Sequence, residues 1–227
     1  MRLSITRTTE SSRRASRLLL RKRRLYDTRE EQTMMIKNVY SEIPVLENDR
    51  FILRAIRGEK DADDLLKVYS DEKAVPFFNS DNCNGDDFHY DTMERMRKAI
   101  GFWDYSYRQQ FFVRWAIEDK ENAVVIGTIE LFNRSAGDYF SNCGLLRLDL
   151  RSDYETKDHI ESILSIIIPG AEELFACDKI ATKAIADAGE RILALESLGF
   201  RLSKETLIGH DGAKYNSYYV TERKAWN

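Results

Sequence analysis

Three consecutive segments in the middle of the chain strongly favour extended backbone. Residues 111–118 (FFVRWAIE) and 123–132 (AVVIGTIELF) are rich in aromatic and β-branched side chains, and the polar turn DKEN separates them, which predicts a β-hairpin. Gly127 inside the second segment indicates a bulge or a close approach of two backbones. In residues 143–151 (CGLLRLDLR) leucines alternate with charged residues, which predicts a third strand with one apolar face. The centre of the chain must therefore belong to a sheet.

Helical spacing of apolar residues appears on both sides of these strands. Residues 61–69 and 93–103 each carry one apolar stripe, and Asp61 is placed to cap the first helix. A further helix is predicted from Asp153, with a break at Pro169-Gly170. The other predicted elements are strands at 50–56, 179–185, 201–208 and 214–221 and a helix at 188–198.

The alternation of strand and helix in the second half predicts an α/β (α+β) fold, with a mixed sheet covered by helices on both faces. A chain of 227 residues can bury one core without a disulfide or metal staple. An apolar fraction of 43% and a charged fraction of 32% exclude a collagen-like or mostly disordered chain. Apolar runs stay shorter than about 18 residues, so no membrane span is predicted.

The first 33 residues differ from the rest in the sign of their charge. They hold ten Lys/Arg and four Asp/Glu, a net of +6, whereas the remaining residues hold 25 and 34, a net of −9. We predict a basic, flexible arm at residues 1–42 and a folded domain at 43–227. We interpret the arm as a solvated tail. Open alternatives are a transit peptide, weak nucleic-acid contacts through Arg21–Arg24, and a translation start at Met34 or Met35.

The chain has few cysteines and histidines, and they are widely spaced: Cys83, Cys143, Cys177, His89, His159 and His210. This pattern lacks both a disulfide framework and zinc-ligand spacing. We therefore predict no metal site and no Cys–His nucleophile. Because the start of the chain also lacks a secretory-signal pattern, we expect a cytoplasmic protein.

Four strings stand in one order along residues 43–227: Leu46–Arg54 (LENDRFILR), Ile126–Ile129 (IGTI), Ala194–Phe200 (ALESLGF), and Tyr219 with Arg223 and Trp226. Together with the predicted elements, they resemble the GNAT acetyltransferase superfamily, and within it the branch that acetylates ribosomal-protein N-termini. In that branch they correspond to the opening strand, a hairpin strand, an LEKLGF string and the closing strand. The resemblance implies a GNAT-like, mostly antiparallel central sheet.

The resemblance also implies acetyl-CoA as the cofactor and a place for it. In the family the fourth strand separates from the fifth, and the pantetheine pairs with the exposed strand backbone. The pyrophosphate lies at the N-terminus of the next helix, where amide groups and the helix dipole favour an anion. Segments 144–151 and 179–185 are therefore expected to separate. The implied cofactor-binding residues are Leu148, Leu150, Arg151, Thr156, Lys157, Asp158, His159 and Ile160.

The pyrophosphate loop departs from the family pattern. The family has Arg/Gln-Gly-x-Gly-x-Gly/Ala, and this chain has ETKDHI at residues 155–160. Glu155 and Asp158 stand where phosphates would dock, and two like charges about 4 Å apart cost on the order of 1 kcal/mol in water. A structural interpretation is that Ser152 and Glu155 form a capping box. Two interpretations of this loop remain open: it binds the pyrophosphate of the cofactor, or its own side chains cap the helix.

Other functional positions of the family differ as well. The family's Asn before the last helix corresponds to Ala188, and its usual Ser corresponds to Arg191. A frequent tyrosine general acid corresponds to Leu195, and a strand glutamate to Leu145.

Acetyl transfer to an amine needs a base, or a bound neutral amine, and a proton donor for the leaving thiolate. Asp149 is the first candidate base and Glu130 the second, because the family geometry turns both toward the acceptor side. Tyr219, or its neighbour Tyr218, is the candidate proton donor. The structural alternatives are paired strand carboxylates and packed strand tyrosines. Three aromatic residues are candidates for the wall of the acceptor site: Phe77, Phe78 and Trp103.

These patterns predict an acyl-CoA-dependent N-acetyltransferase that acts by direct transfer on a primary amine, either a small molecule or a protein N-terminus. The alternative is a degenerate GNAT-fold domain that does not bind CoA and serves as a binding or scaffold module. We expect no membrane partner, and the acidic body restricts nucleic-acid contact to the arm. A homodimer is an open option.

Overall fold

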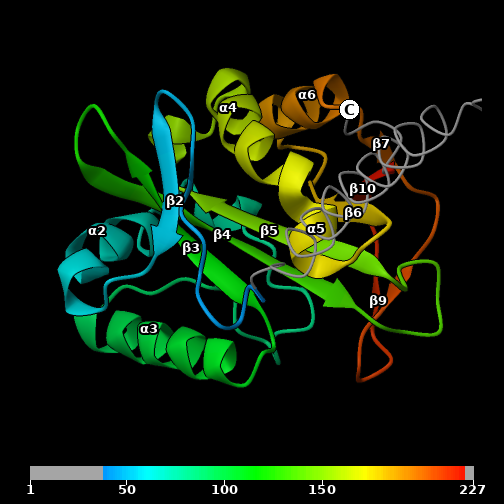
Figure 1. The fold of residues 1–227 in the computed structure, drawn as a ribbon, viewed down its shortest axis with the longest axis horizontal. Helices are drawn as coiled ribbons and strands as arrows, with labels where there is room; N and C mark the ends of the chain where they lie inside the picture. Colours follow the sequence, from blue (N-terminus) through cyan, green and yellow to red (C-terminus); the bar gives the residue numbers. More distant parts are fainter. Residues whose placement is uncertain (1–37, 223–227) are drawn as a thin grey trace, which may run out of the picture. The chain divides into compact units, whose positions relative to one another are not determined.

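The computed structural model describes residues 38–222, which form an eight-stranded sheet with helices on both faces (Figure 1). The strand order is β1-β2-β3-β4-β5-β6-β10-β7, in which β5 and β6 are parallel and the other neighbours antiparallel. The strands are β1 (Leu46–Glu47), β2 (Phe51–Ala55), β3 (Val113–Asp119), β4 (Val124–Arg134), β5 (Cys143–Leu150), β6 (Lys179–Lys183), β7 (Arg201–Leu202) and β10 (Tyr218–Glu222). A separate hairpin pairs β8 (Leu207–Ile208) with β9 (Lys214–Tyr215). The predicted fold class is confirmed.

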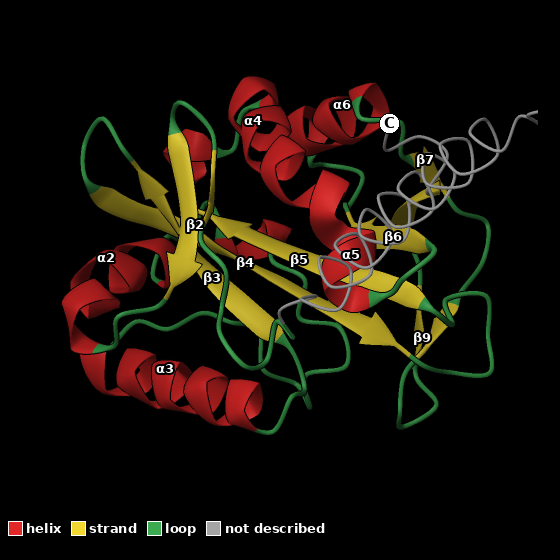
Figure 2. Ribbon diagram, viewed as in Figure 1, coloured by secondary structure: helices red, strands yellow, loops and turns green. Residues whose placement is uncertain are grey.

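The helices divide between the two faces of the sheet (Figure 2). One face carries α2 (Glu59–Tyr69) and α3 (Met93–Arg108), and the other carries α4 (Lys157–Ile167), α5 (Ala171–Phe175) and α6 (Gly189–Ser197). Three short 3-10 turns lie between them: η1 (Val75–Phe77), η2 (Ser152–Tyr154) and η3 (Ile168–Gly170). The predicted break at Pro169-Gly170 is confirmed, because η3 separates α4 from α5.

Each face of the sheet builds an apolar layer. The first layer lies under α4, α5 and α6 and includes Leu148 and Ile163, and the second lies under α2 and α3 and includes Leu65 and Met96. Burying one such side chain contributes about 1.5–3 kcal/mol. The predicted alternation in β5 is confirmed, because Leu146, Leu148 and Leu150 enter the first layer while Asp149 is on the opposite face.

Gly127 allows β4 and β5 to approach closely. A Cβ atom at this position would lie 2.2 Å from the Asp149 main-chain oxygen. The pairing of β3 with β4 also shifts register here, because Ile117 pairs with Gly127 whereas Glu118 pairs with Val125. Both the bulge and the close approach predicted from this glycine are therefore present.

Three local predictions are wrong. Helix α2 starts two residues before Asp61, which instead accepts hydrogen bonds from Arg54 at 2.8 and 2.9 Å. The helix predicted from Asp153 begins at Lys157, after a 3-10 turn. The closing strands are interrupted, and Ser217 has a φ of 66°, which breaks the strand before β10.

The predicted boundary of the basic arm at residue 42 stays a prediction, because residues 1–37 lie outside the described residues. Arg223 and Trp226, which carried part of the family resemblance, also lie outside them.

Val39 is buried in the first layer, and its main-chain oxygen accepts a hydrogen bond from the Tyr107 hydroxyl at 3.1 Å.

Strands β5 and β6 separate, as the resemblance predicts. Their pairing ends at Leu146 and Thr182, while β5 continues to Leu150 and stays paired with β4. In the described part of the chain, residues 147–150 therefore have no strand neighbour on the side of β6. We call this gap the β5–β6 opening.

Candidate functional site

The β5–β6 opening is bridged by the guanidinium of Arg191 from α6. Its Nε and Nη2 donate to the two carboxylate oxygens of Glu155, each at 2.7 Å. Its Nη1 donates to the main-chain oxygens of Leu148, at 2.9 Å, and Phe77, at 3.0 Å. Only 2% of the Arg191 side chain is exposed. We call Arg191 with these three partners the Arg191 bridge.

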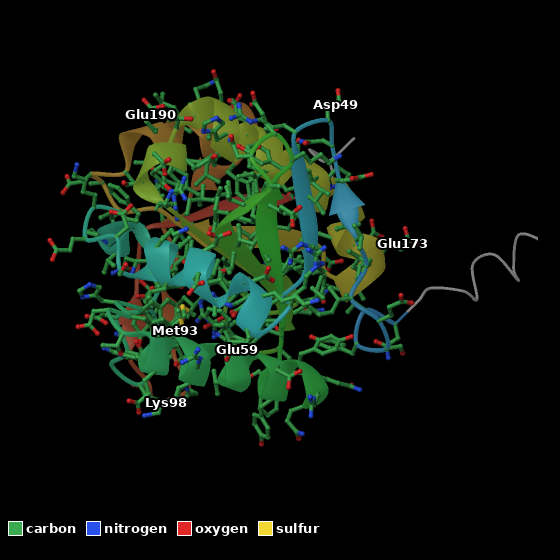
Figure 3. All side chains as sticks on the ribbon, turned by 90° about the vertical axis from the view of Figure 1, so that its left-hand side faces the viewer. Asp49, Glu59, Met93, Lys98, Glu173 and Glu190 are labelled. Carbon is green, nitrogen blue, oxygen red and sulfur yellow. The ribbon has the colours of Figure 1, made fainter. Side chains whose placement is uncertain are left out.

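The N-terminus of α4, where the resemblance places a pyrophosphate, is occupied by the chain itself. The Lys157 amide donates to Glu190 Oε2 at 2.8 Å, and the His159 amide donates to the Thr156 hydroxyl at 3.5 Å. Figure 3 shows Glu190 on the opposite edge of the molecule from Lys98 of α3. Free amides at a helix N-terminus attract anions, so these partners compete with a phosphate.

The capping box predicted for this loop is wrong, although the helix is capped. The Ser152 amide donates to Asp71 Oδ2 at 2.8 Å, and the Glu155 carboxylate binds Arg191. The cap of α4 is Thr156, because a 3-10 turn delays the start of the helix.

The eight residues implied as cofactor ligands stay predictions, and most of their side chains are buried or have protein partners. Three have apolar side chains buried in the first layer: Leu148, Leu150 and Ile160. The two cations have carboxylate partners: Arg151 with Asp153 at 2.6 Å and Lys157 with Glu161 at 2.7 Å. Thr156 caps α4, Asp158 is exposed in its first turn, and His159 packs against Tyr154. Burial lowers the pKa of His159, so this ring supplies little positive charge near pH 7.

Glu130 and Asp149 lie in a buried cluster of charges on the face that α2 and α3 cover. The strand register places Arg114, Glu130 and Arg147 side by side on β3, β4 and β5. Glu130 accepts hydrogen bonds at 2.7 Å from both arginines. Asp149 Oδ2 accepts from Arg114 at 2.9 Å and from the Tyr69 hydroxyl at 2.8 Å. Two arginines thus balance two carboxylates.

This cluster keeps Glu130 ionised. Burial alone would raise the pKa of Glu130. The charges of Arg114 and Arg147 have a larger, opposite effect, so the pKa of Glu130 lies below the ordinary 4.5. A carboxylate held ionised in this way is a weak proton acceptor. Neither Glu130 nor Asp149 is among the residues that line the two pockets described below, and their catalytic roles stay predictions.

Tyr218 and Tyr219 lie on opposite faces of β10. Tyr219 is in the first apolar layer, where burial raises its pKa, and its role as proton donor stays a prediction. The Tyr218 hydroxyl donates to Asp81 Oδ2 at 3.2 Å, and burial raises the Tyr218 pKa as well.

One open pocket, pocket A, lies beside the point where β5 and β6 separate. Its volume is about 470 Å³, and it is lined by Asp81, Asn82, Phe132, Arg134, Ser135, Ala136, Gly137, Asp138, Leu145, Arg147, Leu207, Ile208, Gly209, His210 and Tyr218. Asp81 Oδ1 accepts from Lys183 at 2.5 Å, and its main-chain oxygen accepts from Arg147 at 2.9 Å. Asp81 therefore ties the end of β6 to β5 at the floor of pocket A.

A second pocket, pocket B, of about 640 Å³, lies between α3 and the segment before β1, and its wall includes Ile43, Ile56, Trp103, Tyr107 and Arg114. The Arg114 guanidinium is 4.6 Å from the centre of the Trp103 ring. Of the three aromatic residues expected near an acceptor, Trp103 lines pocket B, Phe78 packs on Tyr69, and Phe77 contributes its carbonyl to the Arg191 bridge.

Residues 50–201 match the family model of the acetyltransferase (GNAT) domain. The chain belongs to the GNAT acetyltransferase family. This GNAT chain is 28% identical over 86 residues to an uncharacterized N-acetyltransferase of Bacillus subtilis, YoaA. The match covers 38% of this chain and 44% of that relative, so it spans less than half of either protein.

The fold of this chain is similar to the folds of solved acetyltransferase structures. Mycobacterium smegmatis RimJ in complex with CoA-disulfide is 13% identical, with a TM-score of 0.60 over 80% of this chain and 87% of that one. The ribosomal-protein-S5-alanine acetyltransferase of Vibrio fischeri is 15% identical, with a TM-score of 0.56 over 81% and 99%. At such identities the likeness concerns the fold. Within residues 38–222, no helix is long and apolar enough to cross a membrane, and no His, Cys, Asp and Glu side chains gather as a metal site.

The side chains of this GNAT domain do not fit acetyl-CoA as they stand at the place where the resemblance puts it. The Leu148 carbonyl and the Lys157 amide, on which the resemblance places pantetheine and pyrophosphate, already have protein partners. Carboxylates of Glu155, Asp158 and Glu190 surround the start of α4 and would oppose phosphate charges.

Two site residues were missed by sequence reasoning. Arg191 was noted only as a departure from the family serine, and nothing in the local pattern signals a partner 36 positions away. Asp81 lies in a polar loop, and its contacts with Lys183 and Tyr218 span more than 100 residues.

Proposed function

We propose that this GNAT chain transfers an acetyl group from acetyl-CoA to a primary amine that binds in pocket A. The position of pocket A supports this most directly, because its floor contains Leu145 and Arg147, where β5 parts from β6. Acetyl-CoA would supply the activated acetyl thioester. An acceptor in pocket A would lie at the start of the strand segment on which the family holds its cofactor.

The pairing of the pocket A carboxylates favours an amine of low basicity. Asp81 is paired with Lys183, and Asp138 is paired with Arg134 at 2.5 and 2.8 Å. Both carboxylates are thus held by cations, and we propose that the amine enters pocket A in its neutral form. An α-amino group has a pKa of about 7.7–8.0 and a lysine side chain one of about 10.4, so near pH 8 only the former is substantially neutral. We therefore propose a peptide N-terminus, or a small amine of similar pKa, as the acceptor.

A second candidate function is a binding domain on the GNAT fold that does not take acyl-CoA. The Arg191 bridge favours it, because the bridge fills the β5–β6 opening with a buried ion pair. The acidic groups at the start of α4 favour it as well.

The release of free thiol from acetyl-CoA distinguishes the two functions. With the full chain at about pH 8, a peptide with a free N-terminus should release thiol, and an N-acetylated peptide that contains lysine should not. Preference for lysine would contradict the proposed acceptor. If neither the natural chain nor the opened variant described below releases thiol, the binding-domain function stands instead.

A further inference from the structure

The Arg191 side chain passes through the sheet at the β5–β6 opening. It starts on α6, which packs on the first apolar layer, and reaches the carbonyl of Phe77 in η1. The next residue, Phe78, belongs to the second layer and packs on Tyr69 at a ring-centroid distance of 5.3 Å. One guanidinium thus connects elements from both faces of the sheet.

The bridge occupies a backbone acceptor that a bound cofactor would need. Arg191 Nη1 is 2.9 Å from the Leu148 oxygen, within the four residues of β5 that have no β6 partner. A ligand that pairs with this stretch of β5 meets the guanidinium first. Because Arg191 already donates to this oxygen, a ligand that takes the same hydrogen bond must displace the guanidinium.

Two departures from the family pattern, at positions 155 and 191, make one device. Glu155 stands where the family has Arg or Gln, and Arg191 stands where it has Ser. Either residue alone would bury an uncompensated charge, since the Glu155 side chain is 7% exposed and the Arg191 side chain 2%. Together they form a bidentate pair, the strongest arrangement of guanidinium and carboxylate. Random loss of a cofactor site does not require such complementary changes.

The end of α6 that carries Arg191 has a weak cap. The helix starts at Gly189 after Ala188, and no side chain caps its first turn. Ser, Thr, Asp and Asn caps hold a helix start in place, and their absence favours fraying of the first turn. Arg191 lies in that turn, so local opening of α6 would withdraw the guanidinium from Leu148, Phe77 and Glu155 together.

We propose that the Arg191 bridge is an autoinhibitory closure of the acyl-CoA slot, so that acyl-CoA enters only after Arg191 leaves Leu148 and Phe77. This inference rests on the proposed function, since acyl-CoA is taken as the ligand of the slot.

Acetyl-CoA binding to the full chain tests the closure, measured by isothermal titration calorimetry and by the shift in Tm. The opened variant is Arg191→Ser with Glu155→Gln, which removes both charges together. It should bind acetyl-CoA at least about tenfold more tightly than the natural chain. The matched control is Arg97→Ser with Glu59→Gln, which breaks an exposed Arg–Glu pair on α2 and α3. The control should bind as the natural chain does.

The possible results separate the closure from the proposed function. Tighter binding by the opened variant alone supports both. Equal binding by the natural chain and the opened variant overturns the closure and leaves the proposed function intact. A folded opened variant that binds no acetyl-CoA overturns both. If the double variant does not fold, Glu155→Gln alone keeps the volume and weakens the pair, and it should still bind more tightly; equal binding then overturns the closure.

Discussion

The main-chain oxygen of Leu148 accepts a hydrogen bond from Arg191 at 2.9 Å, across the gap where β5 has lost its parallel neighbour. A buried carbonyl without a partner costs about 1–3 kcal/mol. Arg191 therefore supplies the hydrogen bond that a longer β6 would have supplied. The same contact occupies the opening that we propose as the acyl-CoA slot, so stability and cofactor access would be opposed at this one residue.

The coupling between Arg191 and Glu155 should be large. Arg191→Ala leaves a buried carboxylate without a counter-charge, and we expect a loss of about 3–5 kcal/mol in the free energy of unfolding. Arg191→Ala combined with Glu155→Ala should lose less than the sum of the two single variants. Urea denaturation of all four chains measures the coupling. Additive losses would show that the two side chains act independently.

Stability should depend on pH through Glu130. Its pKa in the folded protein lies below the ordinary 4.5, because Arg114 and Arg147 outweigh the effect of burial. The contribution of its ionised form is therefore complete above about pH 4.5 and is lost as the pH falls through the lower folded value. The difference in unfolding free energy between the natural chain and Glu130→Gln should be largest near neutral pH and shrink in acid. A difference that is constant with pH would contradict the ion pairs.

The contact between β4 and β5 makes Gly127 sensitive to substitution. In Gly127→Ala the new Cβ would lie 2.2 Å from the Asp149 oxygen, so the strands must move apart. We expect a loss of about 1–3 kcal/mol, typical of overpacking. The control is Gly101→Ala in α3, where the added Cβ meets nothing within 4 Å, and helix propensity predicts a gain of up to about 1 kcal/mol. Thermal unfolding measures both, and similar Tm values for the two variants would contradict the close approach.

Pocket A can be tested through Asp81. Asp81→Asn weakens the pairing with Lys183 and changes the charge of the pocket wall. If the amine binds in pocket A, its KM should rise by about tenfold while the KM for acetyl-CoA stays nearly constant. Glu94→Gln on the exposed face of α3 serves as the control. An unchanged amine KM with a folded protein would place the acceptor elsewhere.

Much of the framework could be predicted from the residues because it follows local periodicity. The alternation in β5 and the apolar stripes of α2 and α3 reflect periods of two and 3.6 residues, which tertiary context did not override. The start of α4 was misplaced because the capping-box pattern of Ser152 and Glu155 competed with contacts from Asp71 and Arg191. Local capping signals fail where distant partners bind the same groups more strongly.

The candidate site was harder to predict. The alternation in residues 143–151 placed Asp149 on the polar face of its strand, but the sequence did not show that Arg114 and Arg147 lie close to Asp149 and Glu130. That relationship depends on the register of three strands. Register is a property of paired segments, so it is visible only once the pairing is known.

By itself, the sequence determined the fold and the departures at positions 155–160, 188 and 191, because periodicity and residue identity are local properties of the chain. Only the tertiary structure decided what those departures do. It brings Arg191 and Glu155, separated by 36 positions, into a bidentate pair inside the β5–β6 opening. A buried charge is tolerated only beside its partner, and the partner is chosen by packing in space and not by neighbourhood along the chain.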